Sequence, residues 1–154
     1  MAGKIMAHIL ASGIELPKAA MPVANYVPVV ISKDHAYVSG QISIWNGEVK
    51  FMGQLGAGMA LEDGKAAARL CGLNIIAQLQ AALGDLDRVV RCVKLNVYVN
   101  STADFIEQPK VANGVSDLMV EVFGETGKHA RAAIGVAQLP FGVAVEVDGV
   151  FEVS

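Results

Sequence analysis

Residues 61–99 read LEDGKAAARLCGLNIIAQLQAALGDLDRVVRCVKLNVYV, and this segment determines the architecture expected for the chain. In its first part, apolar residues recur at the three- and four-residue spacing of one helix face. These residues are Ala66, Leu70, Leu73 and Ala77. The periodicity predicts an amphipathic helix over residues 61–83, and Gly84 follows at the position of a left-handed helix cap.

The second part of the segment alternates with the two-residue period of a strand. One face of this strand would hold Val93, Leu95, Val97 and Val99. The opposite face would hold Cys92, Lys94, Asn96 and Tyr98. We therefore expect a strand over residues 89–99 with the first set against a core and the second set in wetter surroundings.

Further elements are predicted on both sides of this segment. Apolar runs predict strands over residues 26–31, 36–41, 130–136 and 143–153, and a short strand near 49–52. A second helix is predicted between Pro109 and Gly124, from apolar residues at helical spacing. We expect a single domain over residues 1–154, a two-layer α/β or α+β fold with a mixed sheet on two helices.

Composition excludes several classes of protein. The chain is 53% hydrophobic and 18% charged, which excludes a disordered chain. A net charge of −3 without a basic run argues against a nucleic-acid partner. The longest uncharged stretches, 70–84 and 132–145, are shorter than the ~18–20 residues of a membrane span, so no membrane partner is expected. The apolar excess predicts a homo-oligomer.

The cysteines and histidines do not form a metal-binding pattern. Cys71 and Cys92 lie far apart without a C-x-x-C spacing, so we expect reduced core thiols in a cytoplasmic protein. His8, His35 and His129 are scattered along the chain, and no metal site is expected. No glycine-rich nucleotide-binding motif is present, and no cofactor is expected.

Two charged residues stand in the most apolar third of the chain. Arg131 begins a run of small and apolar residues, and Glu146 lies between Val145 and Val147. A lone charge in such a strand is unfavourable unless it is paired or solvated. One interpretation is an Arg131–Glu146 ion pair or an exposed sheet edge. The other is a guanidinium at the rim of an apolar pocket that binds a ligand carboxylate, with Tyr26 as a wall.

Three ordered motifs resemble the RidA/YjgF family of reactive-intermediate deaminases, formerly labelled L-PSP endoribonucleases. The first comprises Tyr26 and the run Tyr37-Val38-Ser39-Gly40-Gln41. The second extends from Gly64 through Asn74 to Val90. The third comprises His129-Ala130-Arg131-Ala132-Ala133, Leu139-Pro140 and Val145-Glu146-Val147. Together they extend over about residues 16–153.

The resemblance implies a chorismate-mutase-like α+β fold and a homotrimer with ligand clefts between adjacent subunits. It also implies hydrolysis of enamine and imine intermediates to 2-keto acids and ammonia. By position, Arg131 would hold the carboxylate of a small substrate, and Glu146 would orient or activate the water. Tyr26 and Ser39 would line the cleft, and Asn113 is the candidate for a pocket-lining asparagine of the family.

The chain also departs from the family pattern. Ala133 stands in the cleft where many deaminating members have a cysteine, and Gly135 replaces a larger residue. Extra residues occur around 43–58 and 106–116. A non-catalytic trimer that binds a keto acid is therefore the alternative function. A ribonuclease is disfavoured because the chain is acidic and lacks paired histidines.

Overall fold

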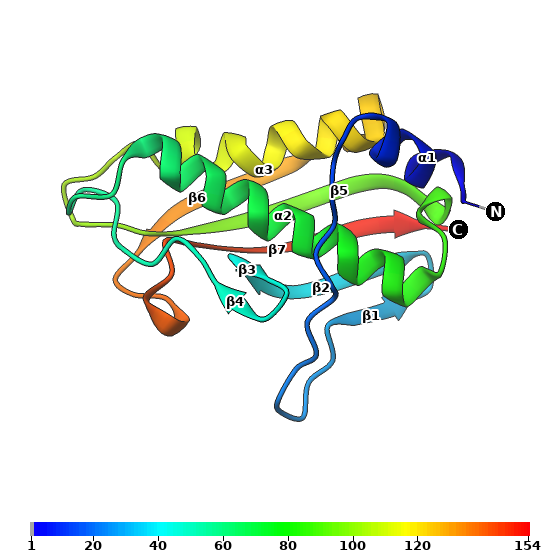
Figure 1. The fold of residues 1–154 in the computed structure, drawn as a ribbon, viewed down its shortest axis with the longest axis horizontal. Coiled ribbons are helices and arrows are strands. Elements are labelled where there is room, and N and C mark those ends of the chain that lie inside the picture. Colours follow the sequence, from blue (N-terminus) through cyan, green and yellow to red (C-terminus); the bar gives the residue numbers. More distant parts are fainter. Residues whose placement is uncertain (1) are drawn as a thin grey trace.

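A computed structural model describes residues 2–154. A five-stranded sheet in the order β1-β2-β7-β5-β6 forms one layer, and two long helices pack on one of its faces (Figure 1). The strands are β1 (Val29–Ser32), β2 (His35–Ile42), β5 (Val89–Asn100), β6 (Ala130–Val136) and β7 (Val145–Val153). The helices are α1 (Lys4–Ala11), α2 (Leu61–Leu83) and α3 (Gln108–Phe123). The expected two-layer α+β architecture is confirmed.

The sheet is mixed, as predicted. Its neighbours pair antiparallel from β1 to β5, whereas β5 and β6 pair parallel. A parallel pair needs a crossover connection, and α3 provides it. Arg131 on β6 is in register with Leu95 on β5, and Glu146 on β7 is in register with Tyr98.

Helix α2 has the predicted bounds and the predicted cap. Gly84 adopts a positive φ of 76°, and its N–H bonds to the carbonyl of Gln80. By length and composition α2 could cross a membrane, but most of its apolar window is buried inside the fold, as in a core helix. Cys71 of α2 and Cys92 of β5 are free and buried, as expected.

The predicted alternation of core-facing and outward-facing side chains in β5 holds only in the second half of the strand. Leu95, Val97 and Val99 are fully buried. Cys92, however, is also fully buried, whereas Val93 is only half-buried. The register between β5 and β7 shifts between Cys92 and Lys94, and this irregularity moves Cys92 to the core face. The predicted assignment of Cys92 and Val93 was therefore wrong.

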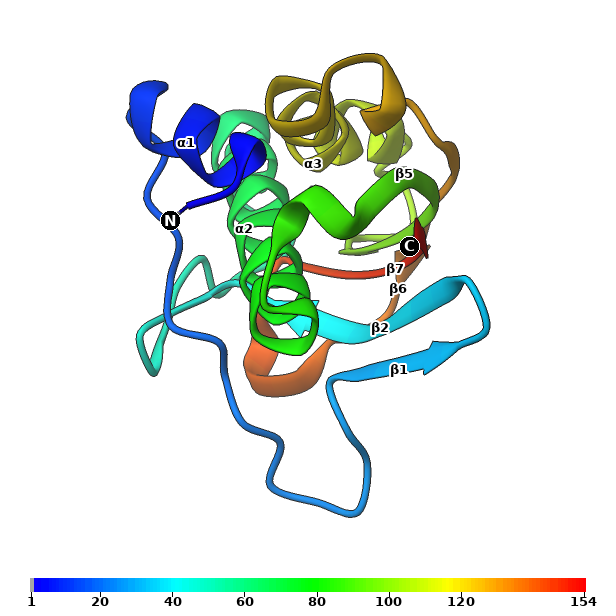
Figure 2. The same cartoon turned by 90° about the vertical axis from the view of Figure 1, so that its right-hand side faces the viewer.

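Other differences lie before residue 60. The strand expected from Tyr26 begins only at Val29, because Pro28 has no N–H for strand pairing. Tyr26 therefore lies in the connection between α1 and β1, which extends away from the sheet (Figure 2). The short strand expected near 49–52 is a separate hairpin of β3 (Ile44–Trp45) and β4 (Glu48–Val49).

Helix α1 was not predicted. Its first turn is fixed by Asp87, whose two carboxylate oxygens accept hydrogen bonds from the N–H groups of Lys4 and Ile5, both at 2.8 Å. These hydrogen bonds lower the pKa of Asp87 below its usual range. The sequence around α1 lacks a local capping side chain, so only the folded chain brings the cap to it.

Helices α2 and α3 approach each other closely at two glycine residues, Gly72 and Gly114. A Cβ at Gly114 of α3 would lie 2.0 Å from the carbonyl oxygen of Lys65 on α2. A Cβ at Gly72 of α2 would lie 2.8 Å from Cγ2 of Val115. These contacts fix the distance between the helices, and α3 is the helix that lies against β6.

We predict that Gly114→Ala destabilises the fold, because the new methyl group would overlap backbone atoms that cannot rotate away. Overpacking of this kind costs about 1–3 kcal/mol of unfolding free energy, measurable by urea denaturation. Asp117→Ala, an exposed position on the same helix, is expected to stay within about 0.5 kcal/mol of the parent chain. Equal stability of Gly114→Ala and the parent would show that the helices can separate without cost.

Candidate functional site

Arg131 is held by the first half of α3. Its Nη1 donates to Oδ1 of Asn113 at 2.9 Å and to Oγ of Ser116 at 3.1 Å, and its Nη2 donates to the carbonyl of Pro109 at 3.4 Å. The structure therefore brings together the predicted residues Arg131 and Asn113. Ala133, two residues along β6, packs against the core on the same face.

The positive charge of Arg131 is not neutralised within residues 2–154. Its three acceptors are an amide, a hydroxyl and a backbone carbonyl, and no carboxylate in this range forms an ion pair with it. The Nε–H likewise finds no acceptor among these residues. The Nε and Nη2 edge of a guanidinium matches the two oxygens of a carboxylate, so Arg131 can bind one in bidentate form.

Two further polar side chains adjoin Arg131 that the sequence reading missed. The Oγ of Ser116 lies 2.9 Å from Nε2 of His129, and Nδ1 of His129 lies 2.6 Å from the carbonyl of Gly127. Ser116 follows Asn113 by three residues, so both project from one helix face. This spacing could have identified Ser116 from the sequence. A cavity of about 230 Å³ opens here, lined by Ser116, Asp117, Val120, Lys128, His129 and Arg131.

Glu146 lies on the opposite face of the sheet. Its register partner Tyr98 donates a hydrogen bond to Asp148 at 2.8 Å, and Asn96 donates to the same carboxylate at 2.8 Å. Burial raises the pKa of Glu146 above its usual range, and repulsion from Asp148 adds to the shift. The hydrogen bond to Asp148 is the main cause of a raised pKa for Tyr98.

Tyr26 and Ser39 are both linked to Gly40: Ser39 precedes it in β2, and Tyr26 lines a cavity with it. Ser39 of β2 donates to the carbonyl of Val27 at 2.7 Å, which ties the loop with Tyr26 to the strand. Tyr26 is half-exposed and lines a cavity of about 250 Å³ together with Gly40. A Cβ at Gly40 would lie 2.9 Å from Oε1 of Glu146, so the carboxyl group lies directly over this glycine.

Arg131 and Glu146 do not form an ion pair within one chain. Arg131 shares a sheet face with Leu95, which is fully buried under the helices, whereas Glu146 shares a face with Tyr98. Leu95 and Tyr98 are three residues apart on β5, an odd separation that places them on opposite faces. The interpretation of the two residues as an intramolecular ion pair was therefore wrong.

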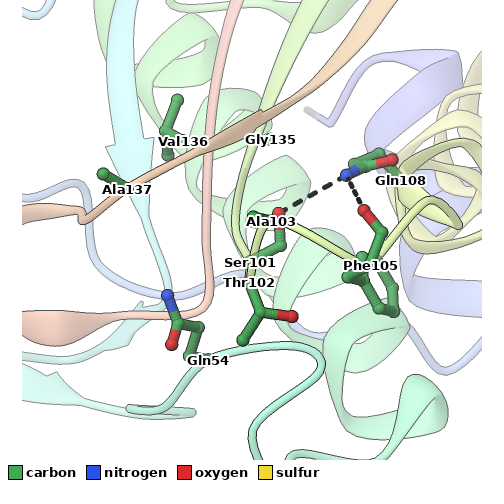
Figure 3. Close-up of a pocket in the computed structure, with 9 residues that line it drawn as sticks. All are labelled: Gln54, Ser101, Thr102, Ala103, Phe105, Gln108, Gly135, Val136 and Ala137. Carbon is green, nitrogen blue, oxygen red and sulfur yellow. Dashed lines mark hydrogen bonds between the residues drawn. The ribbon is translucent and has the colours of Figure 1, made fainter.

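A cavity of about 550 Å³, larger than the two described above, is lined by none of the predicted site residues (Figure 3). It lies at the carboxyl ends of β5 and β6, where Gln108 donates to Oγ of Ser101 at 3.4 Å and to the carbonyl of Phe105 at 2.7 Å. A Cβ at Gly135 would lie 2.6 Å from Oγ of Ser101. A side chain at position 135 would therefore displace the side chains of Ser101 or Gln108. Among residues 2–154, no cluster of three His, Cys, Asp or Glu side chains could hold a metal ion.

Comparisons with known proteins agree on one family. Residues 6–148 match a family model described as "YjgF/chorismate_mutase-like, putative endoribonuclease". The chain is 54% identical to Protein TCP17 of Trypanosoma cruzi over 99% of its own length and 96% of that protein.

Two solved structures are also similar. One, described as "a putative endoribonuclease" from Shewanella oneidensis, is 36% identical with a TM-score of 0.93, covering 98% of this chain and 100% of the other. RidA from the Antarctic bacterium Psychrobacter is 28% identical with a TM-score of 0.63, covering 90% and 97%.

We predict that Glu146→Gln stabilises the folded chain near neutral pH. Because the folded-state pKa of Glu146 is raised, its contribution to stability is present at low pH and is lost as the pH rises through that pKa. Glutamine stays neutral, so its Tm should exceed the parent's by a few degrees at about pH 8, and the difference should shrink toward about pH 4. Glu152→Gln, on the same strand, is the control, and equal Tm values for Glu146→Gln and the parent at both pH values would contradict the prediction.

Proposed function

The chain belongs to the YjgF/chorismate mutase-like family, and on that premise we propose that it hydrolyses reactive 2-imino acids and their enamines to 2-keto acids and ammonia. The observation that favours this function is the uncompensated guanidinium of Arg131, whose Nε–H has no acceptor among residues 2–154. A 2-imino acid has a carboxylate next to its electrophilic carbon. Binding that carboxylate to Arg131 therefore fixes the reacting carbon with respect to the protein.

The proposed role of Glu146 is to accept a proton from the attacking water. The water oxygen bonds to the imine carbon, and the imine nitrogen takes up a proton. The amine nitrogen of this adduct then takes up the proton held by Glu146, and the carbon–nitrogen bond breaks so that ammonia leaves. The hydroxyl of the adduct returns its proton to Glu146 as the carbon–oxygen double bond of the keto acid forms. A carboxyl whose pKa is raised toward neutrality is better matched to such proton transfers than an ordinary glutamate. Tyr26 and Ser39 would form the wall beside the water.

The proposed site requires two copies of the chain. Arg131 and Glu146 lie on opposite sheet faces, so no single chain can present both to one small substrate. We propose a homotrimer in which Arg131 of one subunit meets Tyr26, Ser39 and Glu146 of the next. Exposed apolar side chains on the sheet face away from the helices support such an interface: Val30, Tyr37 and Ile134.

RNA cleavage is not the function we propose, although relatives are named as endoribonucleases. Binding to a polyanion depends on neutralising phosphates with Lys and Arg. This chain has 12 such residues against 15 Asp and Glu, a net charge of −3.

We predict that Arg131→Ala abolishes most of the acceleration of imine hydrolysis. Hydrogen bonds to charged groups contribute about 1.5–3 kcal/mol, so kcat/KM should fall roughly 10- to 100-fold, measured as loss of imine absorbance with freshly generated 2-iminobutanoate. Arg69→Ala, which removes an arginine paired with Glu121 on the helical surface, is the matched control and should retain the parent rate. An unchanged rate in Arg131→Ala would refute the proposal. Tight binding of 2-oxobutanoate by a parent chain without turnover would favour the non-catalytic alternative.

We predict that light scattering gives a mass of about three times the 16.1 kDa of one chain. Arg131→Ala should keep this mass, because its side chain contacts α3 of its own chain. Ile134→Arg, which places a charge on the half-exposed apolar face, should dissociate the assembly and remove activity together. A monomeric, active parent chain would contradict the proposed two-subunit site.

A further inference from the structure

A hydrogen-bonded chain of side chains extends from Arg131 to a histidine. Nη1 of Arg131 donates to Oγ of Ser116, and that oxygen lies 2.9 Å from Nε2 of His129. The other ring nitrogen of His129 faces the carbonyl of Gly127, which can only accept, so Nδ1 holds the proton of the neutral ring. In this state Nε2 is an acceptor, and the hydroxyl proton of Ser116 is directed to it.

Protonation of His129 changes which hydrogen bonds the hydroxyl group of Ser116 donates and accepts. A hydroxyl has one donor and two acceptor lone pairs. With His129 charged, Nε2–H donates to Oγ of Ser116, and Nη1 of Arg131 fills the second lone pair. The hydroxyl proton then has no acceptor in the chain Arg131–Ser116–His129 and is free to point into the cavity. The same event adds a second positive charge beside the guanidinium.

Other charged groups surround His129 without interrupting this chain. Lys128 pairs with Glu125 at 3.0 Å, and its carbonyl accepts from Nη2 of Arg91. Asp117 is the one carboxylate among the cavity-lining residues. Lys94 of β5 alternates with the buried Leu95 and so lies on the other face of the sheet.

We infer that Arg131, Ser116 and His129 form an anion site in the cavity of about 230 Å³ that these three residues line. Ser116 is a hydroxyl donor to an anion in this cavity, beside the guanidinium, and His129 is a positioning residue that controls the donor. This inference rests on the proposed role of Arg131 as the carboxylate anchor. Protonated His129 releases the Ser116 hydroxyl to the anion, and a bound anion in turn holds the proton on His129. By linkage, protonation of His129 strengthens anion binding by the same free energy by which a bound anion strengthens proton binding at His129.

The direct test follows the three histidine rings by NMR over about pH 5–8.5, with and without a saturating anion. 2-Oxobutanoate is the carboxylate probe, and sulfate is a second probe that keeps its charge over this range. We expect either anion to move the midpoint of the His129 titration to higher pH, and affinity to be about fivefold tighter at pH 5.5 than at pH 8. His8 and His35 lie on α1 and β2 and serve as internal controls that should not respond.

Variants separate this role from a merely structural one. His129→Gln should still bind the anion through Arg131, but with an affinity that no longer changes between about pH 5.5 and 8. Ser116→Ala should likewise uncouple the His129 titration from the anion, whereas His35→Gln should behave as the parent. A His129 midpoint that saturating anion leaves unchanged would overturn the inference.

The outcomes also distinguish this inference from the proposed function. A parent chain that couples anion binding to His129 yet does not accelerate imine hydrolysis would refute the deaminase and leave the anion site standing. Conversely, imine hydrolysis that depends on Arg131, with a His129 titration indifferent to both anions, would support the deaminase and refute the anion site.

Discussion

The arrangement of the site depends on one constraint: only one face of the sheet is covered by helices. Successive side chains of a strand point to opposite faces, so each polar residue on a strand either meets the helix layer or lies on the open face. Arg131 meets α3, and Glu146 lies on the open face. The two groups with opposite charge are thus separated by the sheet itself. This separation is the reason why the proposed function requires a second copy of the chain.

The close approach of α2 and α3 determines how well Arg131 is positioned. Gly114 allows α3 to lie against the backbone of Lys65, and one turn on either side of Gly114 presents the acceptors of Pro109, Asn113 and Ser116 to the guanidinium. An arginine side chain loses considerable rotamer entropy when it is fixed. Here the hydrogen bonds to α3 fix most of the Arg131 side chain before a ligand binds. Ligand binding therefore costs less side-chain entropy.

Local periodicity made much of the fold predictable. The bounds of α2, the cap at Gly84 and the presence of strands β5 and β6 followed from residue spacing, and a lone charge in an apolar strand identified Arg131. Helix α1 was not predictable because its cap, Asp87, lies about 80 positions away in sequence. The irregularity near Cys92 is equally non-local, since it arises from pairing with β7. His129 was dismissed as a metal ligand, but its contact with Ser116 depends on how β6 docks on α3.

The separation of Arg131 from Glu146 also has an energetic consequence. Had the two faced each other, the ion pair would have lowered the pKa of the carboxylate and compensated the positive charge of the guanidinium. Instead, burial raises the pKa of Glu146 and repulsion from Asp148 adds to the shift, while Arg131 is bound only by neutral acceptors. Each group therefore retains what a carboxylate-bearing substrate and a water molecule would need: an uncompensated positive charge and a carboxyl that exchanges protons nearer neutral pH. An intramolecular ion pair would have removed both properties.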